Sequence, residues 1–255
     1  MKHTLTSEWI KLRTVTVHWV LVILAVAFPI VVTMLGAIFG NWSGPQPFRS
    51  SDIESLITGL TIVTAMVLGA MTATSLTAEY NHNTIRPTFA ATPSRLRAHG
   101  SKLIVLCAVV GAATLFAVLA SWLIAQLILM LRDLSISLGD DGVIAGLVSV
   151  VVLAVTVTMF GYALGLLIRN APATITLLLL WPLIIENLLL GLFAVTDAEL
   201  ISKWLPYSAA ITAVVVDGSD SGDDILGRPW GLVWFAFVSL VLLGIGLLTE
   251  QRRDA

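Results

Sequence analysis

Six long apolar stretches, separated by shorter polar ones, dominate the chain. Every stretch reaches the roughly 20 residues that a helix needs to cross the ~30 Å apolar core of a bilayer. The pattern predicts membrane-spanning helices at about residues 18–39, 56–78, 103–131, 143–168, 171–195 and 229–249. We therefore expect an all-α membrane protein with six transmembrane helices, in which residues 1–255 form a single transmembrane domain without an internal repeat.

Charged residues are distributed unevenly between the two sides of these spans. Eleven of the sixteen acids fall on one side. Ten of the fourteen Lys and Arg residues fall on the other, namely Lys2, Lys11, Arg13, Arg86, Arg95, Arg97, Lys102, Arg169, Arg252 and Arg253. Because an excess of Lys and Arg marks cytoplasmic loops, we expect both termini in the cytoplasm.

The composition agrees with a membrane protein and excludes several other classes. The chain is 57% hydrophobic and 12% charged, whereas a soluble domain carries about 25% charge. It has no basic patch with interleaved aromatic residues, so we expect no nucleic-acid partner. The single cysteine, Cys107, cannot form an intrachain disulfide, and no zinc-type ligand spacing occurs, so we expect no metal site.

Two segments outside the spans have patterns of their own. Residues 1–17 predict an N-terminal amphipathic interfacial helix, with apolar positions at Leu5, Trp9 and Leu12 and polar positions at Lys2, Glu8, Lys11 and Arg13. The alternative is a simple extension of the first span. Residues 196–228 form the longest external loop, and Lys203 and Pro206 break its apolar part, so a re-entrant or surface-lying helix pair fits best.

Residues 79–102, between the second and third spans, predict a short, bent, polar element in the cytoplasm. Arg86 precedes Pro87, and a residue before proline is disfavoured in a helix. Thr92 and Pro93 then suit the N-cap and the first position of the next helix. Such a segment is more elaborate than a simple connection requires, which suggests that it docks onto another protein.

The same segment reads Glu79-Tyr80-x-x-x-Thr84-Ile85-Arg86-x-Thr88-x-x-x-x-Pro93-x-Arg95, with Lys102 at the start of the next span. It resembles the second cytoplasmic segment of ABC-2-type permeases, the transmembrane subunits of bacterial ATP-binding-cassette exporters. The start at residues 7–13, the end of the fourth span at residues 161–170 and the external Trp204-Leu205-Pro206 resemble the same family, so the resemblance covers essentially the whole chain.

The resemblance implies a six-helix half-transporter in a bacterial cell membrane, paired with a second copy or a paralogue and surrounded by lipid. Its loop helix, at about residues 80–91, would sit in a groove of a separate ABC ATP-binding subunit, which would hold ATP and Mg. The chain itself lacks the Gly-x-x-x-x-Gly-Lys-Ser/Thr loop that binds nucleotide phosphates, so we expect no enzymatic activity and no cofactor in it. The implied ATPase-coupling residues are Glu79, Tyr80, Thr84, Arg86, Pro93, Arg95, Lys102 and Arg169.

Glu186 is the ionisable residue that the pattern places deep within a span, and such residues are functional candidates. Pro182 must kink the same helix. Glu186 could line a cavity or be paired across a dimer interface, or it could be protonated and bonded to a neighbouring helix. In the family the second and fifth helices line the central cavity, which makes the substrate-cavity candidates Thr58, Thr61, Thr72, Ser75, Trp181, Glu186 and Asn187. Hydroxyl groups within a span can also simply bond to their own helix.

Three classes of function are compatible with this sequence pattern. The resemblance favours an exporter of hydrophobic or amphipathic substrates. An ion-gradient-driven secondary transporter using Glu186 is the alternative, but it would need several buried charges or matching broken helices. An intramembrane enzyme would need a cluster of reactive groups at one depth, which the sequence does not offer.

The small residues and the histidines have simpler interpretations. Two stripes of small residues, at positions 161 and 165 and at positions 65, 69 and 73, would let helices approach closely, within one chain rather than between chains. His3, His18, His82 and His99 pair with no acid at ligand spacing, so we interpret all four as surface residues.

Overall fold

The computed structural model describes residues 2–40, 50–85, 87–88, 94–132, 143–196, 199–215 and 229–253, and these residues contain helices and no strand. The helices are α1 (Lys2–Thr14), α2 (Thr16–Phe39), α3 (Ser50–Asn81), α5 (Arg95–Met130), α6 (Val143–Ile168), α7 (Ala171–Leu180), the π-helical turn η1 (Trp181–Ile185), α8 (Glu186–Val195), α9 (Glu199–Ser202), α10 (Pro206–Val215) and α11 (Trp230–Arg253). Among these described residues, six helical stretches are long and apolar enough to cross a membrane, which confirms the predicted number.

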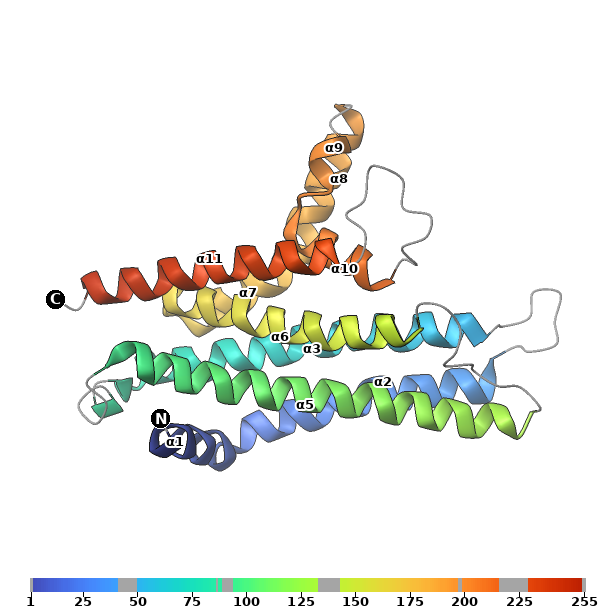
Figure 1. The fold of residues 1–255 in the computed structure, drawn as a ribbon, viewed down its shortest axis with the longest axis horizontal. Coiled ribbons are helices and arrows are strands. Elements are labelled where there is room, and N and C mark those ends of the chain that lie inside the picture. Colours follow the sequence, from blue (N-terminus) through green and yellow to red (C-terminus); the bar gives the residue numbers. More distant parts are fainter. Residues whose placement is uncertain are drawn as a thin grey trace.

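The long helices lie side by side in one bundle (Figure 1). Helix α3 is central and packs against α2, α5, α6 and α7, while α11 packs against α6 and α10. One end of the bundle gathers α1, the last turn of α3, the start of α5, the α6–α7 junction and the last turn of α11 (Figure 1). We call it the charged end, because it holds Lys11, Glu79, Lys102 and Glu250 in contact with one another or with nearby charges.

The seam between α3 and α6 depends on residues without a side chain. A Cβ atom on Gly161 would lie 2.9 Å from the carbonyl oxygen of Gly69, and one on Gly165 would lie 3.1 Å from the side chain of Leu76. The two backbones therefore approach closely at these glycines. Both predicted stripes of small residues meet within one chain, as the sequence favoured.

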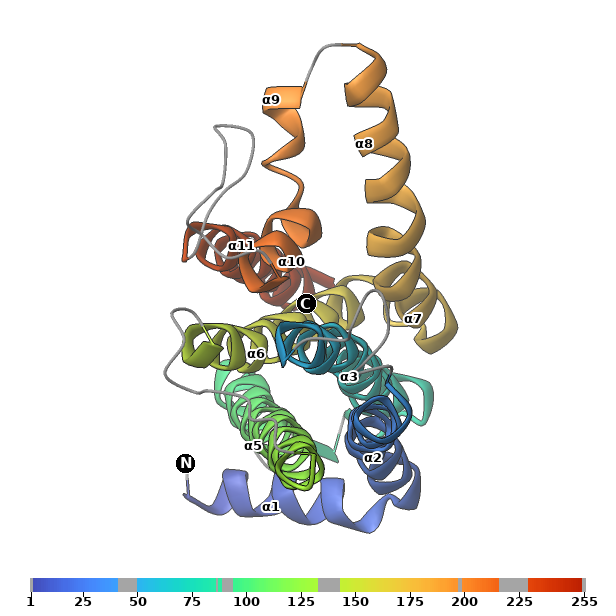
Figure 2. The same ribbon diagram turned by 90° about the vertical axis from the view of Figure 1, so that its right-hand side faces the viewer.

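The fifth predicted span is helical but bent. Pro182 has no N–H to donate, and the N–H of Glu186 bonds to the carbonyl oxygen of Trp181, which gives a wider π-helical turn. Beyond this turn α8 leaves the direction of α7 and projects with α9 from the side of the bundle (Figures 1 and 2). The kink expected at Pro182 is thus present, and segment 171–195 is not a straight rod. The described part of the 196–228 segment holds the two short helices α9 and α10.

Helix α1 runs across the bundle and is separated from α2 by Val15, whose backbone is extended (Figure 2). The structure corrects the position that the sequence assigned to one residue of this helix. Glu8 is only 8% exposed, although the pattern placed it on the wet side. The reason is that Glu8 and Leu12, one helical turn apart, both face the bundle, where α1 packs against α5.

Candidate functional site

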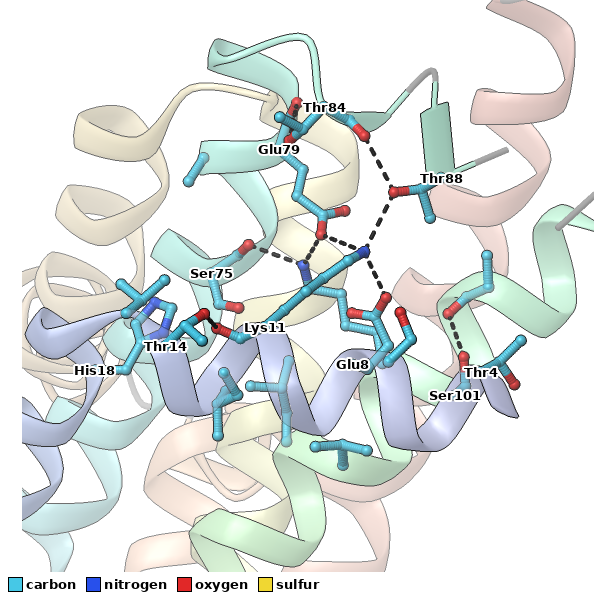
Figure 3. Close-up of a pocket in the computed structure, with 18 of the residues that line it drawn as sticks. Thr4, Glu8, Lys11, Thr14, His18, Ser75, Glu79, Thr84, Thr88 and Ser101 are labelled. Atoms are coloured by element: carbon cyan, nitrogen blue, oxygen red, sulfur yellow. Dashed lines mark hydrogen bonds and ion pairs between the residues drawn. The ribbon is translucent and has the colours of Figure 1, made fainter. Parts of the chain in front are cut away.

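A pocket of about 830 Å³ opens at the charged end between α1, the end of α3 and the start of α5 (Figure 3). Apolar side chains such as Leu12 and Val105 form part of its wall. Charged and hydroxyl-bearing residues form the rest, and several of them bond across the pocket. The pocket therefore combines an apolar floor with a polar network that links three helices.

The network is centred on the carboxylate of Glu79 at the end of α3. Its Oε1 lies 2.9 Å from Nζ of Lys102 and 3.3 Å from Nζ of Lys11. Lys11 also donates to Oε1 of Glu8 at 2.6 Å and to Oγ1 of Thr88 at 3.2 Å (Figure 3). We call these five residues the Glu79 cluster. Two carboxylates balance two ammonium groups, so the charges compensate each other in a partly buried place.

The amino group of each lysine is held on several sides. Lys102 is 6% exposed and also donates to the backbone carbonyl oxygen of Ser75 at 2.9 Å. Burial lowers the pKa of Lys11, but the hydrogen bonds and negative charges of Glu8 and Glu79 outweigh it, so its pKa is raised above the ordinary lysine value. Lys11 is therefore charged at neutral pH and stays attracted to both acids.

A tight turn after α3 brings Thr88 to the cluster. Asn83 adopts a left-handed backbone with φ of 55°, which Asn tolerates better than most residues. The N–H of Thr84 bonds to the carbonyl oxygen of Glu79 at 2.9 Å, and the hydroxyl of Thr88 donates to the backbone carbonyl oxygen of Thr84 at 3.0 Å. The chain after α3 thus folds back over the Glu79 cluster.

A second polar cluster surrounds Glu250, whose side chain is 1% exposed. Its Oε1 accepts a hydrogen bond from the Tyr80 hydroxyl, and its Oε2 lies 2.5 Å from Nε2 of His99. The guanidinium of Arg169 lies 4.0 Å from Oε1, and Arg95 donates to the backbone carbonyl oxygen of Glu250 at 3.2 Å. We call these five residues the Glu250 cluster. It joins α3, α5, the α6–α7 junction and α11.

Two further contacts strengthen this second cluster. The guanidinium of Arg169 lies 4.7 Å from the ring centroid of Tyr80, which is cation–π geometry. Nδ1 of His99 lies 2.7 Å from the hydroxyl of Tyr162, a fully buried residue of α6. The α6–α7 junction itself is a tight turn, in which Arg169 has φ of 56° and Asn170 caps α7.

Glu186 lies elsewhere in the fold and has neutral partners. Its Oε1 accepts from the Trp181 indole N–H and the Tyr207 backbone N–H, both at 2.9 Å. Its Oε2 accepts from the backbone N–H and the hydroxyl of Ser208, both at 2.6 Å. Tyr207 and Ser208 belong to the first turn of α10, where backbone N–H groups lack helical partners and the helix dipole favours negative charge. Glu186 therefore ties the bend of α7–η1–α8 to the start of α10.

The predicted ATPase-coupling residues lie in two neighbouring clusters. Glu79 and Lys102 meet in the Glu79 cluster, whereas Tyr80, Arg95 and Arg169 meet in the Glu250 cluster. Thr84 lies in the turn after α3. Arg86 and Pro93 lie outside the described residues, and α5 begins at Arg95 with Ser94 as its N-cap residue. Contact of these residues with an ATPase stays a prediction.

The predicted substrate-cavity residues have varied surroundings. The hydroxyls of Thr61 and Thr72 are buried and donate to carbonyl oxygens of their own helix at 2.6 and 3.0 Å, the alternative that the sequence left open. Thr58 is also buried, and Ser75 lines the pocket at the charged end. In the bent fifth span, Trp181 bonds to Glu186, and the exposed Asn187 donates to the carbonyl oxygens of Pro182 and Leu183.

The interpretation of the histidines as surface residues is wrong for two of them. His99 is 4% exposed and His18 is 9% exposed, whereas His3 and His82 are exposed. His99 is buried where α6 packs against α5, and it finds polar partners in Tyr162 of α6 and Glu250 of α11.

The sequence interpretation also missed Glu250, because the predicted last span ended at residue 249 whereas α11 continues to Arg253. A usable signal existed on α5. Arg95, His99 and Lys102 are spaced by four and three residues, which places three polar side chains on one face of a helix.

Comparison with known proteins gives one family match. The model of a family described as ABC-2 family transporter protein matches residues 4–185, from α1 to the end of η1. The chain has no match among the curated proteins.

Proposed function

The chain belongs to the ABC-2 family of transporter proteins and is a membrane permease, and we propose that it is the transmembrane subunit of an ATP-driven exporter. The family implies association with an ABC ATP-binding subunit. In this proposal that subunit holds ATP and Mg and hydrolyses the nucleotide, and the present chain performs no catalysis.

The observation that carries the proposal is the Glu79 cluster. The chain after α3 is where the resemblance to ABC-2 permeases places the contact with the ATPase, and Glu79 and Thr88 of this segment bond to α1 and α5. Separating Glu79 from Lys102 would leave a charge unpaired in a largely buried place, which is costly. A displacement of this segment would therefore be passed to α1 and α5 rather than absorbed by the loop.

The cargo and its path are part of the same proposal. We propose a hydrophobic or amphipathic substrate, which would pass between this chain and a second permease, either a copy or a paralogue. The predicted substrate-cavity residues on α3 and the bent fifth span would belong to that path. The charged end would face the cytoplasm of a bacterial cell, as the excess of Lys and Arg on that side indicates.

The bonding of Glu186 argues against the ion-gradient alternative. A transported ion would have to replace partners that already occupy both carboxylate oxygens, including two backbone N–H groups of α10. Losing such buried hydrogen bonds costs about 1–3 kcal/mol for each group left unsatisfied. Glu186 therefore fits a structural role better than reversible ion binding.

Substitution within residues 79–102, which we call the coupling segment, tests the proposal. We expect Glu79→Gln, and separately Arg86→Ala, to leave membrane insertion and ATP hydrolysis by the complex in place but to reduce export by about tenfold or more. Export is read as survival of cells exposed to a panel of amphipathic antimicrobial compounds, and ATP hydrolysis is measured on the purified complex.

Thr249→Val is the matched control for both variants. Thr249 is half-buried at the same end of the bundle, and its hydroxyl bonds to the carbonyl oxygen of Ile245 in its own helix. Wild-type export by Glu79→Gln and Arg86→Ala, under conditions where deletion of the chain abolishes survival, would contradict the coupling role.

A further inference from the structure

The last span, α11, is distant in sequence from residues 79–102, where the ATPase is proposed to act. It packs against α6 and α10, both of which lie away from the chain after α3 in sequence. At the charged end, however, its final turn is reached by side chains of α3 and α5. Tyr80 and His99 bond to or contact the carboxylate of Glu250, and Arg95 bonds to its backbone carbonyl oxygen.

Glu79 and Tyr80 are adjacent residues of α3, but their side chains belong to different clusters. Glu79 bonds to Lys11 and Lys102, whereas the hydroxyl of Tyr80 bonds to Glu250. Adjacent side chains on a helix point in different directions. One displacement of the end of α3 therefore acts on α1 and α5 through one residue and on α11 through the next.

We propose that Glu250 is a positioning residue that makes the end of α11 move together with the coupling segment. The inference rests on the proposed function and extends it from α1, α3 and α5 to the last span. Glu250 would touch neither nucleotide nor substrate, and it would act through Tyr80, Arg95 and His99.

The burial and the bonding of Glu250 suit this role. The side chain is 1% exposed, so water is not available to replace a lost partner. Breaking a buried charge pair by removing one partner is strongly unfavourable, because the remaining charge is left uncompensated. The end of α11 and the groups around it therefore move as one unit. Arg169 adds a further restraint, because it contacts both Glu250 and the Tyr80 ring.

Hydrogen exchange on the complex with its ATPase tests the inference without knowledge of the substrate. The tagged chain is purified with its ATP-binding subunit, and amide exchange is compared between the nucleotide-free complex and the complex trapped with ADP and vanadate. In the wild type we expect nucleotide to change exchange both in residues 79–88 and in residues 245–253. In Glu250→Gln, which keeps the shape of the side chain but removes its charge, the response of residues 79–88 should persist, while that of residues 245–253 falls at least about twofold.

Two further variants keep the test decisive. Thr249→Val, at the neighbouring half-buried position, should respond as the wild type does in both segments. Tyr80→Phe removes only the hydroxyl donor to Glu250, and it should weaken the response of residues 245–253 even if Glu250→Gln fails to assemble.

The outcomes separate this inference from the proposed function. An equal response of both segments in Glu250→Gln and Tyr80→Phe, as in the wild type, would overturn the inference and leave the proposed function standing. A parallel loss in both segments of an assembled complex would also overturn it, because Glu250 would then only support the fold. Failure of the wild-type chain to bind any ATP-binding subunit would instead refute the proposed function, and the inference with it.

Discussion

Glu186 and Glu250 are two acids with the same burial, and the chain stabilises them by different means. Each is 1% exposed. Glu186 is surrounded by neutral donors, two of which are backbone N–H groups at the start of α10. Glu250 is surrounded by side chains that are themselves titratable or charged, namely those of Tyr80, His99 and Arg169.

This difference indicates that Glu186 fixes the arrangement of its helices, whereas Glu250 can take part in a movement between helices. Backbone N–H groups are fixed to their helix, so the bonds of Glu186 lock the bend of the fifth span to α10. The partners of Glu250 come from long side chains on different helices, which can follow one another through a displacement. We therefore assign Glu186 to the stability of the fold and Glu250 to communication between helices at the charged end.

Truncation of Glu186 should have the largest effect on stability. Glu186→Ala removes every bond of the carboxylate and leaves the Tyr207 and Ser208 amides and the Trp181 indole without that acceptor. At about 1–3 kcal/mol for each unsatisfied buried group, the loss should be on the order of 3 kcal/mol or more. Thermal unfolding in detergent measures it, with Thr196→Val on the exposed end of α8 as the control. A thermal unfolding midpoint equal to that of the control would contradict the structural role assigned to Glu186.

Truncation of Glu250 should cost less stability. Glu250→Ala also empties a buried position, but the side chain of its partner Arg169 is 23% exposed and can turn toward water. We expect a loss of about 2 kcal/mol in the same unfolding assay. If Glu250→Ala proved more destabilising than Glu186→Ala, the assignment of the two acids would have to be reversed.

Removal of single hydroxyl groups should have the smallest effects and should separate the two roles most clearly. Ser208→Ala removes one donor to Glu186, and Tyr80→Phe removes one donor to Glu250, so each should cost about 1 kcal/mol in thermal unfolding. Ser208→Ala should keep the nucleotide response of residues 245–253 in hydrogen exchange, which Tyr80→Phe weakens. Loss of that response in Ser208→Ala would show that stability, and not a particular contact, controls it.

Much of the fold could be predicted because bilayer thickness and helix geometry leave few possibilities for a long apolar stretch. The six spans follow from length, the bend from the missing N–H of Pro182, and the α3–α6 seam from glycines at helical spacing. The sequence could not show that α8 leaves the bundle, because that direction depends on the bond between Glu186 and α10, about twenty residues further along the chain.

The candidate site was only partly predictable for a related reason. Residues 79–102 stood out by composition and bends, but the partners of Tyr80 lie far away in sequence, at Arg169 and Glu250. Likewise, nothing near His99 in the sequence indicates an acid, because its partner is on α11. Local patterns can identify which segments are polar, whereas the pairing of charges between helices depends on the tertiary packing.

The most direct test of the central claim is native mass spectrometry of the tagged chain, purified from its own cells in a mild detergent. We predict a complex of two permease subunits with two ATP-binding subunits, each of the latter carrying a phosphate-binding loop. The second permease would be identical to this chain or a paralogue, and the measured masses would show which. A chain that emerges alone, or only with copies of itself, in several mild detergents would contradict the account.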